Sequence, residues 1–126
     1  MTRRFMTLVL SAGLLAASGC SPDYARVRFE LLSSPPASVI ATSDRIEIPE
    51  GVAVVVRAKA ISSNREDFDD TYEMDLISRN REILVSSPAQ ERRDFALIGA
   101  SQGETCLEVY LDGALEDCIP TLVVGQ

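Results

Sequence analysis

The stretch FALIGASQGETCLEVYLDG, residues 95–113, alternates apolar and polar side chains on both sides of a short turn. Its apolar residues fall at every second position, as Phe95 and Leu97 before the turn and Leu107, Val109 and Leu111 after it. A period of two is that of a β-strand with one face buried and the other in water. The stretch therefore predicts two amphipathic strands joined by a tight connection.

The same period recurs along the chain on both sides of this stretch. The further segments are RVRFEL (26–31), RIEI (45–48), GVAVVVRAKA (51–60), TYEMDL (71–76) and EILV (82–85), and TLVVGQ (121–126) is the last apolar segment. Ser, Pro, Asn and Gly punctuate the chain between them, and no segment has a helical stripe with a cap and a stop. About seven to eight short strands without helices predict an all-β fold, an antiparallel sandwich or barrel.

The spacing of apolar residues and glycines resembles that of the bacterial immunoglobulin-like domain of the group 2 type, found in envelope and adhesin proteins. The matching segments are IEIPEG (46–51) before VAVVVRAKA (52–60), MDLISRN (74–80) before EILV, and a strand that reaches Gly99, an A-x-x-G turn at 100–103 and a strand from Thr105. The resemblance covers residues 44–124 and departs from the family at Leu76, where Trp is frequent. It implies an immunoglobulin-like antiparallel β-sandwich with a scaffold or adhesion role and no shared catalytic residues.

The first 20 residues have the layout of an export signal. Two arginines at 3 and 4 are followed by an apolar run at 5–17, and small residues lead from it to Cys20. This run of 13 residues is shorter than the roughly 20 that a membrane-spanning helix needs. The segment therefore predicts a signal peptide rather than a membrane span.

The end of this signal, ASGC at 17–20 followed by Ser21, resembles the lipobox of bacterial lipoproteins, although Ala17 stands where Leu is commoner. The resemblance implies that the Cys20 thiol is acylated with a diacylglyceryl group and that cleavage then makes Cys20 the new N-terminus. The alternative is a plain signal peptide, with Cys20 as a disulfide partner or a free thiol.

Lipidation at Cys20 would divide the chain into a removed signal peptide at 1–19, a lipidated tether at 20–25 and one immunoglobulin-like domain at 26–126. So short a tether would hold the domain close to its membrane. We therefore expect a lipid-anchored protein of the bacterial cell envelope. Ser21, in place of the Asp that often signals inner-membrane retention, favours the outer membrane.

The other two cysteines, Cys106 and Cys118, flank the segment LEVYLDGALED. If LDG forms a three-residue turn with its glycine left-handed, the two cysteines lie opposite each other in a hairpin. Export then favours a structural disulfide, because a redox or metal-binding pair lacks the spacing and the further ligands. The same register sets Glu108 opposite Glu116, an unfavourable like-charge pair that a turn one residue longer would relieve.

The overall charge is acidic. The chain has 12 Lys and Arg against 19 Asp and Glu, a net charge of −7, and loss of residues 1–19 removes two arginines and leaves about −9. Binding to nucleic acid and to anionic lipid headgroups depends on clustered Lys and Arg. We therefore expect no nucleic-acid partner, and repulsion from anionic lipid headgroups.

The densest run of charge is NREDFDDTYEMD, residues 64–75. Asp67, Asp69 and Asp70 are candidate ligands for Ca²⁺, which takes about six to eight oxygen ligands. Counted from Asp67, Tyr72 occupies the sixth position, where an EF-hand loop requires Gly. The alternative is a solvated loop between two strands. Beyond this Ca²⁺ site we expect no cofactor.

The composition argues against catalysis. The chain has no histidine, which removes the commonest general base and the Ser-His triads. A domain of this size rarely encloses a deep cleft. We therefore expect no enzymatic activity, and a binding or structural role toward another envelope protein or a glycan near the membrane. The alternatives are a small-ligand or Ca²⁺-binding lipoprotein that uses the loop at 64–75, and an inhibitor that blocks an enzyme with an edge strand or loop.

Overall fold

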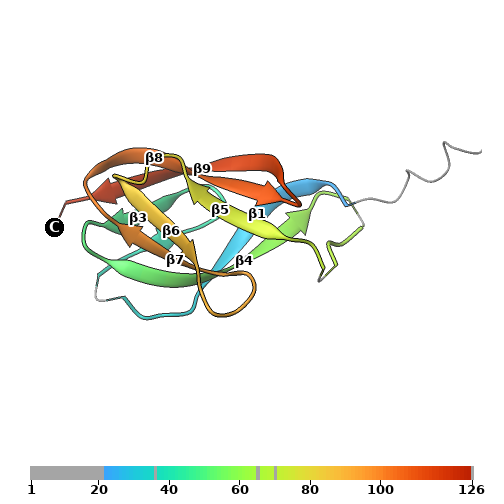
Figure 1. Ribbon diagram of the computed structural model, residues 1–126, viewed down its shortest axis with the longest axis horizontal. Helices are drawn as coiled ribbons and strands as arrows, with labels where there is room; N and C mark the ends of the chain where they lie inside the picture. The colour runs from blue at the N-terminus through green and yellow to red at the C-terminus, as the bar shows by residue number, and fades with distance from the viewer. Residues whose placement is uncertain (1–21, 36, 65, 70, 126) are drawn as a thin grey trace, which may run out of the picture.

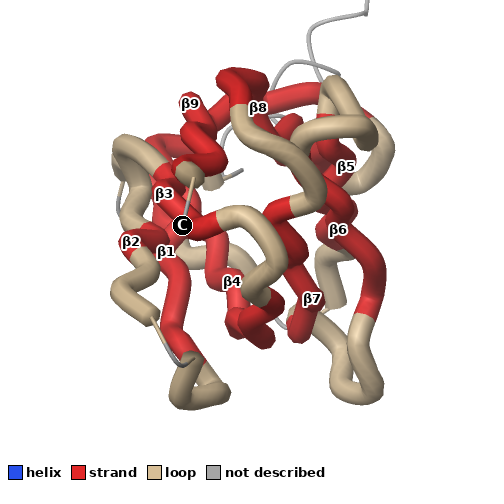
Figure 2. Tube along the Cα trace, turned by 90° about the vertical axis from the view of Figure 1, so that its left-hand side faces the viewer, coloured by secondary structure: helices blue, strands red, loops and turns tan. Residues whose placement is uncertain are grey.

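The computed structural model describes residues 22–35, 37–64, 66–69 and 71–125. Within these residues the chain forms nine β-strands and no helix (Figures 1 and 2). The strands are β1 (Tyr24–Leu31), β2 (Ile40–Ala41), β3 (Ile46–Pro49), β4 (Ala53–Ser62), β5 (Met74–Ser78), β6 (Leu84–Pro88), β7 (Asp94–Gly99), β8 (Gly103–Leu111) and β9 (Ala114–Val124).

The strands form two sheets that pack against each other as layers (Figure 1). The four-stranded sheet has the order β1-β4-β7-β6, and the five-stranded sheet has the order β2-β3-β9-β8-β5. Neighbouring strands are antiparallel except β3 and β9, which run parallel. These orders correspond to the A-B-E-D and C-F-G sheets of immunoglobulin domains. The predicted all-β, immunoglobulin-like sandwich is confirmed.

The core lies between the two sheets and is built from alternate residues of the strands, as the period of two predicts. Val54 and Val56 of β4 and Leu97 of β7 point inward from the four-stranded sheet, and Leu107 of β8 and Ile119 of β9 point inward from the other. Each of these side chains is buried. Burial of such side chains is the main favourable contribution to folding.

Two serines cover backbone groups at the sheet edges. The Ser86 hydroxyl on β6 donates to the Leu76 carbonyl on β5 (2.9 Å) and accepts from the Ser78 N–H (3.2 Å). The Ser43 hydroxyl donates to the Val27 carbonyl on β1 (2.7 Å). Because an uncovered edge can pair with another chain, these contacts protect both sheets against edge-to-edge association.

Gly99, at the end of β7, is the glycine that precedes the turn in residues 95–113, and its surroundings explain why it has no side chain. A Cβ atom at this position would lie 2.5 Å from the carbonyl oxygen of Pro49. The Gly51 N–H donates to the Gly99 carbonyl at 2.7 Å. The end of β7 therefore approaches the β3–β4 turn at a distance that leaves no room for a side chain.

Several strands differ from those predicted from the sequence: β4 was predicted at 51–60, β5 at 71–76, and β9 begins well before the predicted segment at 121–126. β1 begins at Tyr24, so residues 24 and 25 lie in the first strand and not in the tether. β6 spans Leu84–Pro88, because Asn80 caps a turn before it and Pro88, which has no N–H to donate, is tolerated at the end of an edge strand. β2 has only two residues, too few to show a period in the sequence.

Candidate functional site

One end of the sandwich gathers three segments that are distant in the sequence. Figure 1 shows the start of β1, the β4–β5 connection and the β8–β9 turn at this end, and the end of β9 at the other. Cys20 lies outside the described residues, and three residues separate it from Tyr24 in the sequence. Four Cα–Cα steps span at most about 14 Å. A lipid on Cys20 would therefore hold this end of the sandwich near the membrane.

Tyr24 fixes the start of β1 to the opposite sheet. Its hydroxyl donates a 2.8 Å hydrogen bond to Oδ2 of Asp117 on β9. Burial raises the pKa of Tyr24 well above its ordinary value of 10.0, and the Asp117 carboxylate raises it further. The hydroxyl therefore remains a hydrogen-bond donor throughout the physiological range, and it ties the two sheets together where the tether would enter.

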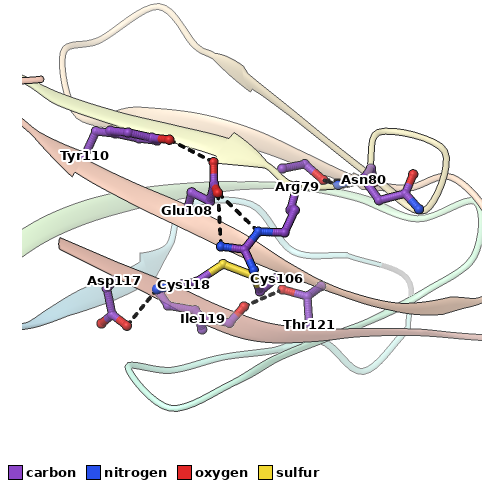
Figure 3. The surroundings of a disulfide bond; sticks show 10 residues. Arg79, Asn80, Cys106, Glu108, Tyr110, Asp117, Cys118, Ile119 and Thr121 are labelled. Carbon is purple, nitrogen blue, oxygen red and sulfur yellow. Dashed lines mark hydrogen bonds and ion pairs between the residues drawn. A yellow bond between two sulfur atoms is a disulfide. The ribbon is translucent and has the colours of Figure 1, made fainter. Parts of the chain in front are cut away.

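Cys106 on β8 and Cys118 on β9 form a disulfide, with Cα atoms 5.4 Å apart (Figure 3). Both side chains are half-buried on the outer face of the five-stranded sheet. The predicted pairing is confirmed. The disulfide links two neighbouring strands of one sheet, a position that suits a structural bond.

The predicted three-residue turn between these strands is wrong. Asp112 and Gly113 alone form the turn, with φ angles of 49° and 85°, and Leu111 lies opposite Ala114. Two successive positive φ angles are those of a type I′ turn, which Asp-Gly forms readily and which matches the twist of a hairpin. A bulge between Val109 and Tyr110, where Glu116 of β9 is the extra residue, then shifts the register by one residue.

This shift changes the neighbours of both cysteines and of Glu108. Cys106 lies opposite Pro120 and Glu108 opposite Cys118, so the disulfide is diagonal and the predicted Glu108–Glu116 pair does not form. Figure 3 shows Glu108 instead between two partners on the same face. Arg79 donates to it from Nε at 3.1 Å, and the Tyr110 hydroxyl donates at 2.9 Å, which raises the pKa of Tyr110.

The end of the sandwich at which β1 begins is called the tether end. An acidic cavity of about 600 Å³ lies there, between the β4–β5 connection, the β8–β9 turn and the start of β1. Its walls carry carboxylates and aromatic rings from all three segments: Glu66, Asp67, Asp69, Asp112, Glu116, Tyr24, Phe68 and Tyr72. Asp112 and Glu116 were not expected here, because only the folded hairpin brings them next to residues 64–75. The Glu73 N–H donates to Asp112 Oδ1 at 2.9 Å and joins the two segments.

The predicted calcium ligands are only partly brought together. Asp67 and Asp69 both line the acidic cavity, and Asp70 lies outside the described residues. Asp69 Oδ1 accepts from the N–H and the hydroxyl of Thr71, at 2.8 and 2.6 Å, and these bonds lower the pKa of Asp69. Among the residues that the structure describes, no group of three acidic or cysteine side chains could hold a metal ion.

Tyr72 holds the acidic loop, residues 64–75, against the sandwich. Its hydroxyl accepts from the Ala60 N–H at 3.1 Å, and its ring packs against Phe68 with centroids 5.4 Å apart. The Arg93 guanidinium lies 3.5 Å from the ring centroid, a cation–π contact. Arg92 and Arg93 both donate to the Tyr72 carbonyl. The described part of the loop is therefore held by contacts from two other segments.

The outer face of β1 and β4 is basic, which the net charge does not indicate. Arg28 lies directly opposite Lys59. Arg26 precedes Arg28 by two residues on β1, so both point to the same outer face. All three side chains are exposed. On the next row Arg57 pairs with the buried Asp94 through two bonds of 2.8 and 3.2 Å, and Asp94 raises the pKa of Arg57. We call Arg26, Arg28 and Lys59 the basic strip.

A hollow of about 230 Å³ adjoins the basic strip. Its charged lining is entirely cationic and comes from β4 and the β6–β7 connection: Arg57, Lys59, Arg92 and Arg93. The sequence contains a signal for this grouping, because Arg26 and Arg28, like Arg57 and Lys59, alternate with apolar residues. The pairing of β1 with β4, which brings them together, is not readable from the sequence.

No described helix is long and apolar enough to cross a membrane.

Comparison with known proteins finds similarity among solved structures. No family model and no curated protein matches the chain. Among solved structures, the chain is similar to the crystal structure of the S-layer protein SbsC domains 4 and 5, with a TM-score of 0.48 and 14% sequence identity. The alignment covers 96% of this chain and 84% of that chain. A similarity at this level does not extend to function.

Proposed function

We propose that this protein is a lipid-anchored lipoprotein of the bacterial cell envelope with a non-catalytic binding or structural role. The anchor is a diacylglyceryl group on Cys20, and the membrane is the outer one. The domain is an immunoglobulin-like module related to the group 2 type, and its partner is another envelope protein or a glycan near the membrane.

The observation that carries this proposal is the start of β1 at Tyr24, only four residues after Cys20. The sandwich would follow the lipidated residue almost directly, so its tether end would lie at the membrane surface. Partners within reach of such a domain are those close to the same membrane.

The chemistry of the chain supports a non-catalytic role. The chain has no histidine, and Cys106 and Cys118 are joined in a disulfide, which leaves no thiolate at these positions. The cavities described above are open hollows at the surface rather than deep clefts that exclude water.

The anchor is tested by producing the full chain in an outer-membrane-bearing bacterium supplied with a clickable palmitate analogue. The wild type is expected to carry the label and to fractionate with the outer membrane. Cys20→Ser is expected to lose the label and the membrane association, and the matched control Cys106→Ser with Cys118→Ser is expected to keep both. A label that persists in Cys20→Ser contradicts the proposal, as does membrane retention after the label is lost.

The partner is sought by crosslinking in intact envelopes, followed by purification of the chain. A non-catalytic binding role predicts that one envelope protein or glycan is enriched with the wild type. Cys20→Ser serves as the control, because without the anchor the domain loses its place at the membrane. Equal recovery with both chains would contradict a partner that depends on membrane attachment.

A second candidate function, small-ligand or Ca²⁺ binding, is favoured by the acidic cavity. Its carboxylates come from two segments, the β4–β5 connection and the β8–β9 hairpin, and carboxylates lining a concave site concentrate a negative potential. Ca²⁺ titration to millimolar levels is expected to raise the melting temperature if the cavity binds the ion, and Asp67→Asn with Asp69→Asn to abolish the rise. An unchanged melting temperature and unchanged spectra of the loop residues would exclude Ca²⁺.

A further inference from the structure

We propose that the basic strip and the adjoining hollow bind anionic lipid headgroups of the membrane that carries the anchor, so that the domain lies with its four-stranded sheet toward the lipid surface. The proposal rests on the proposed lipid anchor at Cys20. It assigns an orientation to the domain and a binding site for the phosphate of a lipid headgroup.

The first observation is a like-charge pair. Arg28 and Lys59 lie directly opposite each other on β1 and β4, and both are exposed. Like charges directly opposite each other across two strands are destabilising. No ion pair within the described residues involves Arg26, Arg28 or Lys59. Three cations therefore stand together without a carboxylate partner in a chain that has an excess of acids.

The second observation is the hollow beside the strip. Arg57, Lys59, Arg92 and Arg93 line a space of about 230 Å³, which is large enough for a phosphate group and its bound water. Arginine recognises phosphate oxygens through paired N–H donors, and lysine acts as a point charge. The charged lining suits an anion of this kind and disfavours a cation.

The third observation is the distance from the anchor. Arg26 is six residues after Cys20 in the sequence, a reach of at most about 21 Å, and Arg28 follows about 7 Å further along β1. Each Lys or Arg near an anionic surface strengthens attachment about fivefold, within roughly a Debye length. The basic strip is thus among the groups nearest to the proposed anchor.

The acidic cavity disfavours the alternative orientation, in which the domain stands upright with its tether end on the membrane. It occupies the tether end, so a domain standing upright would press Glu66, Asp67 and Asp112 against the headgroups. Anionic headgroups repel these carboxylates. Rotation of the sandwich onto its β1–β4 face brings the cations to the lipid and turns the carboxylates away, which reverses the repulsion expected from the net charge alone.

The test uses the full lipidated chain, extracted in detergent and reconstituted into phosphatidylcholine vesicles with or without about 30 mol% phosphatidylglycerol at low salt. Glu30→Cys places a fluorophore on the β1–β4 face, and Glu104→Cys places it on the outer face of the five-stranded sheet. These two glutamates are both exposed, and their replacement changes the net charge equally. Quenching by acrylamide then reports which face is covered.

The expected result is at least about twofold weaker quenching at position 30 than at position 104 in anionic vesicles, and equal quenching in neutral vesicles or at about 1 M salt, where the Debye length is about 3 Å. Arg28→Glu with Lys59→Glu is expected to remove the difference. The matched control, Arg45→Glu with Arg81→Glu, changes the net charge equally and is expected to preserve it. If the charge-reversed variant Arg28→Glu with Lys59→Glu does not fold, the neutral variant Arg28→Gln with Lys59→Gln replaces it in the same measurement.

Equal quenching at both positions in anionic vesicles would overturn the proposal, and so would equal effects of the two charge-reversal pairs. A difference that persists in neutral vesicles would assign the contact to the apolar part of the face instead. Loss of the difference on adding inorganic phosphate, at constant ionic strength, would assign the hollow to free phosphate rather than to lipid.

The proposed anchor fails separately. Mass analysis of the same preparation shows whether Cys20 carries lipid. If it does not, flotation of the chain with the anionic vesicles still tests the strip, with the same variants. Binding that is lost in Arg28→Glu with Lys59→Glu and kept in the matched control would then support the strip alone, and equal binding in both would overturn it.

Discussion

The two sheets of the sandwich present outer faces of different character. On the four-stranded sheet, the basic strip lies toward the tether end, and apolar residues follow along β4 and β7, where Val55 pairs with Ala96 and Ala53 with Ile98. On the five-stranded sheet, Glu104 and Glu108 line β8, and the disulfide joins β8 to β9. The basic strip of the first face has no carboxylate partner among the described residues, although Arg57 on the same face pairs with Asp94, and the second face is acidic and covalently braced.

This difference shows that a chain with a negative net charge can still have one cationic surface region. Two acidic side chains on the five-stranded face have cationic partners close by: Arg79 lies 3.1 Å from Glu108 and Arg45 lies 3.7 Å from Glu47. The cations of the basic strip have none among the described residues. A face whose charges are already paired has less to gain from a charged partner, so the two faces have unequal capacity to bind one.

Removing the disulfide is expected to have the largest effect on stability and to act on one face only. Cys106→Ala with Cys118→Ala opens a link between residues 12 apart, which costs about 3 kcal/mol of unfolding free energy. Urea unfolding measures this loss. Hydrogen exchange is expected to rise first in β8 and β9, and a uniform rise over β4 and β7 as well would contradict a local brace.

Breaking the Arg57–Asp94 pair is the matching test on the four-stranded face. Asp94 is buried and accepts two hydrogen bonds from Arg57, whose side chain is 49% exposed. Asp94→Ala is expected to cost about 2 kcal/mol, because a charge-assisted bidentate pair is lost while Arg57 can return to water. Thermal unfolding tests the loss, with Asp94→Asn as the milder control. A loss no greater than that of an exposed pair would show that the pair contributes little.

Tyr24→Phe tests the bond that joins the two sheets at the tether end. Loss of the hydrogen bond to Asp117 is expected to cost about 1 kcal/mol near neutral pH. The pKa of Tyr24 is raised in the folded protein, so the wild type keeps this stability below pH 10.0, the ordinary pKa of tyrosine, and loses it as the pH rises further. Urea unfolding between pH 8 and 11, compared with Tyr24→Phe, should show the two chains converging, and parallel curves would contradict the assignment.

Arg79→Ala is expected to have the smallest effect. Its partner Glu108 also accepts from Tyr110, and the Arg79 side chain is 57% exposed. Exposed pairs of this kind contribute about 0.5 kcal/mol or less. A chemical unfolding curve that nearly overlays the wild type is expected, and a loss as large as that of Asp94→Ala would remove the contrast between the two faces.

The period of two in the sequence was sufficient to predict the longer strands and the sandwich, but not β2, and the disulfide was predicted from the hairpin spacing of the two cysteines together with export. Alternation fixes which residues of a strand share a face, and this held for Leu107 and Val109. The hairpin register was not predictable, because Asp112 and Gly113 can take part in a two- or a three-residue turn and a bulge leaves no mark in the pattern.

The candidate sites were less predictable than the fold. The acidic character of residues 64–75 is evident from the sequence. Asp112 and Glu116 lie next to them only because of the position of the β8–β9 turn. The basic strip depends on the pairing of β1 with β4, across more than 20 residues of intervening chain. Sites made of residues from separate strands require the topology, which local periodicity does not contain.

The most direct test of the central claim, a sandwich held at the membrane by lipid on Cys20, is mass spectrometry of the N-terminal peptide from the membrane-bound protein. We predict that this peptide begins at Cys20 and carries a thioether-linked diacylglyceryl group. A peptide that begins at another residue, or an unmodified Cys20 in the membrane-bound protein, would contradict the claim.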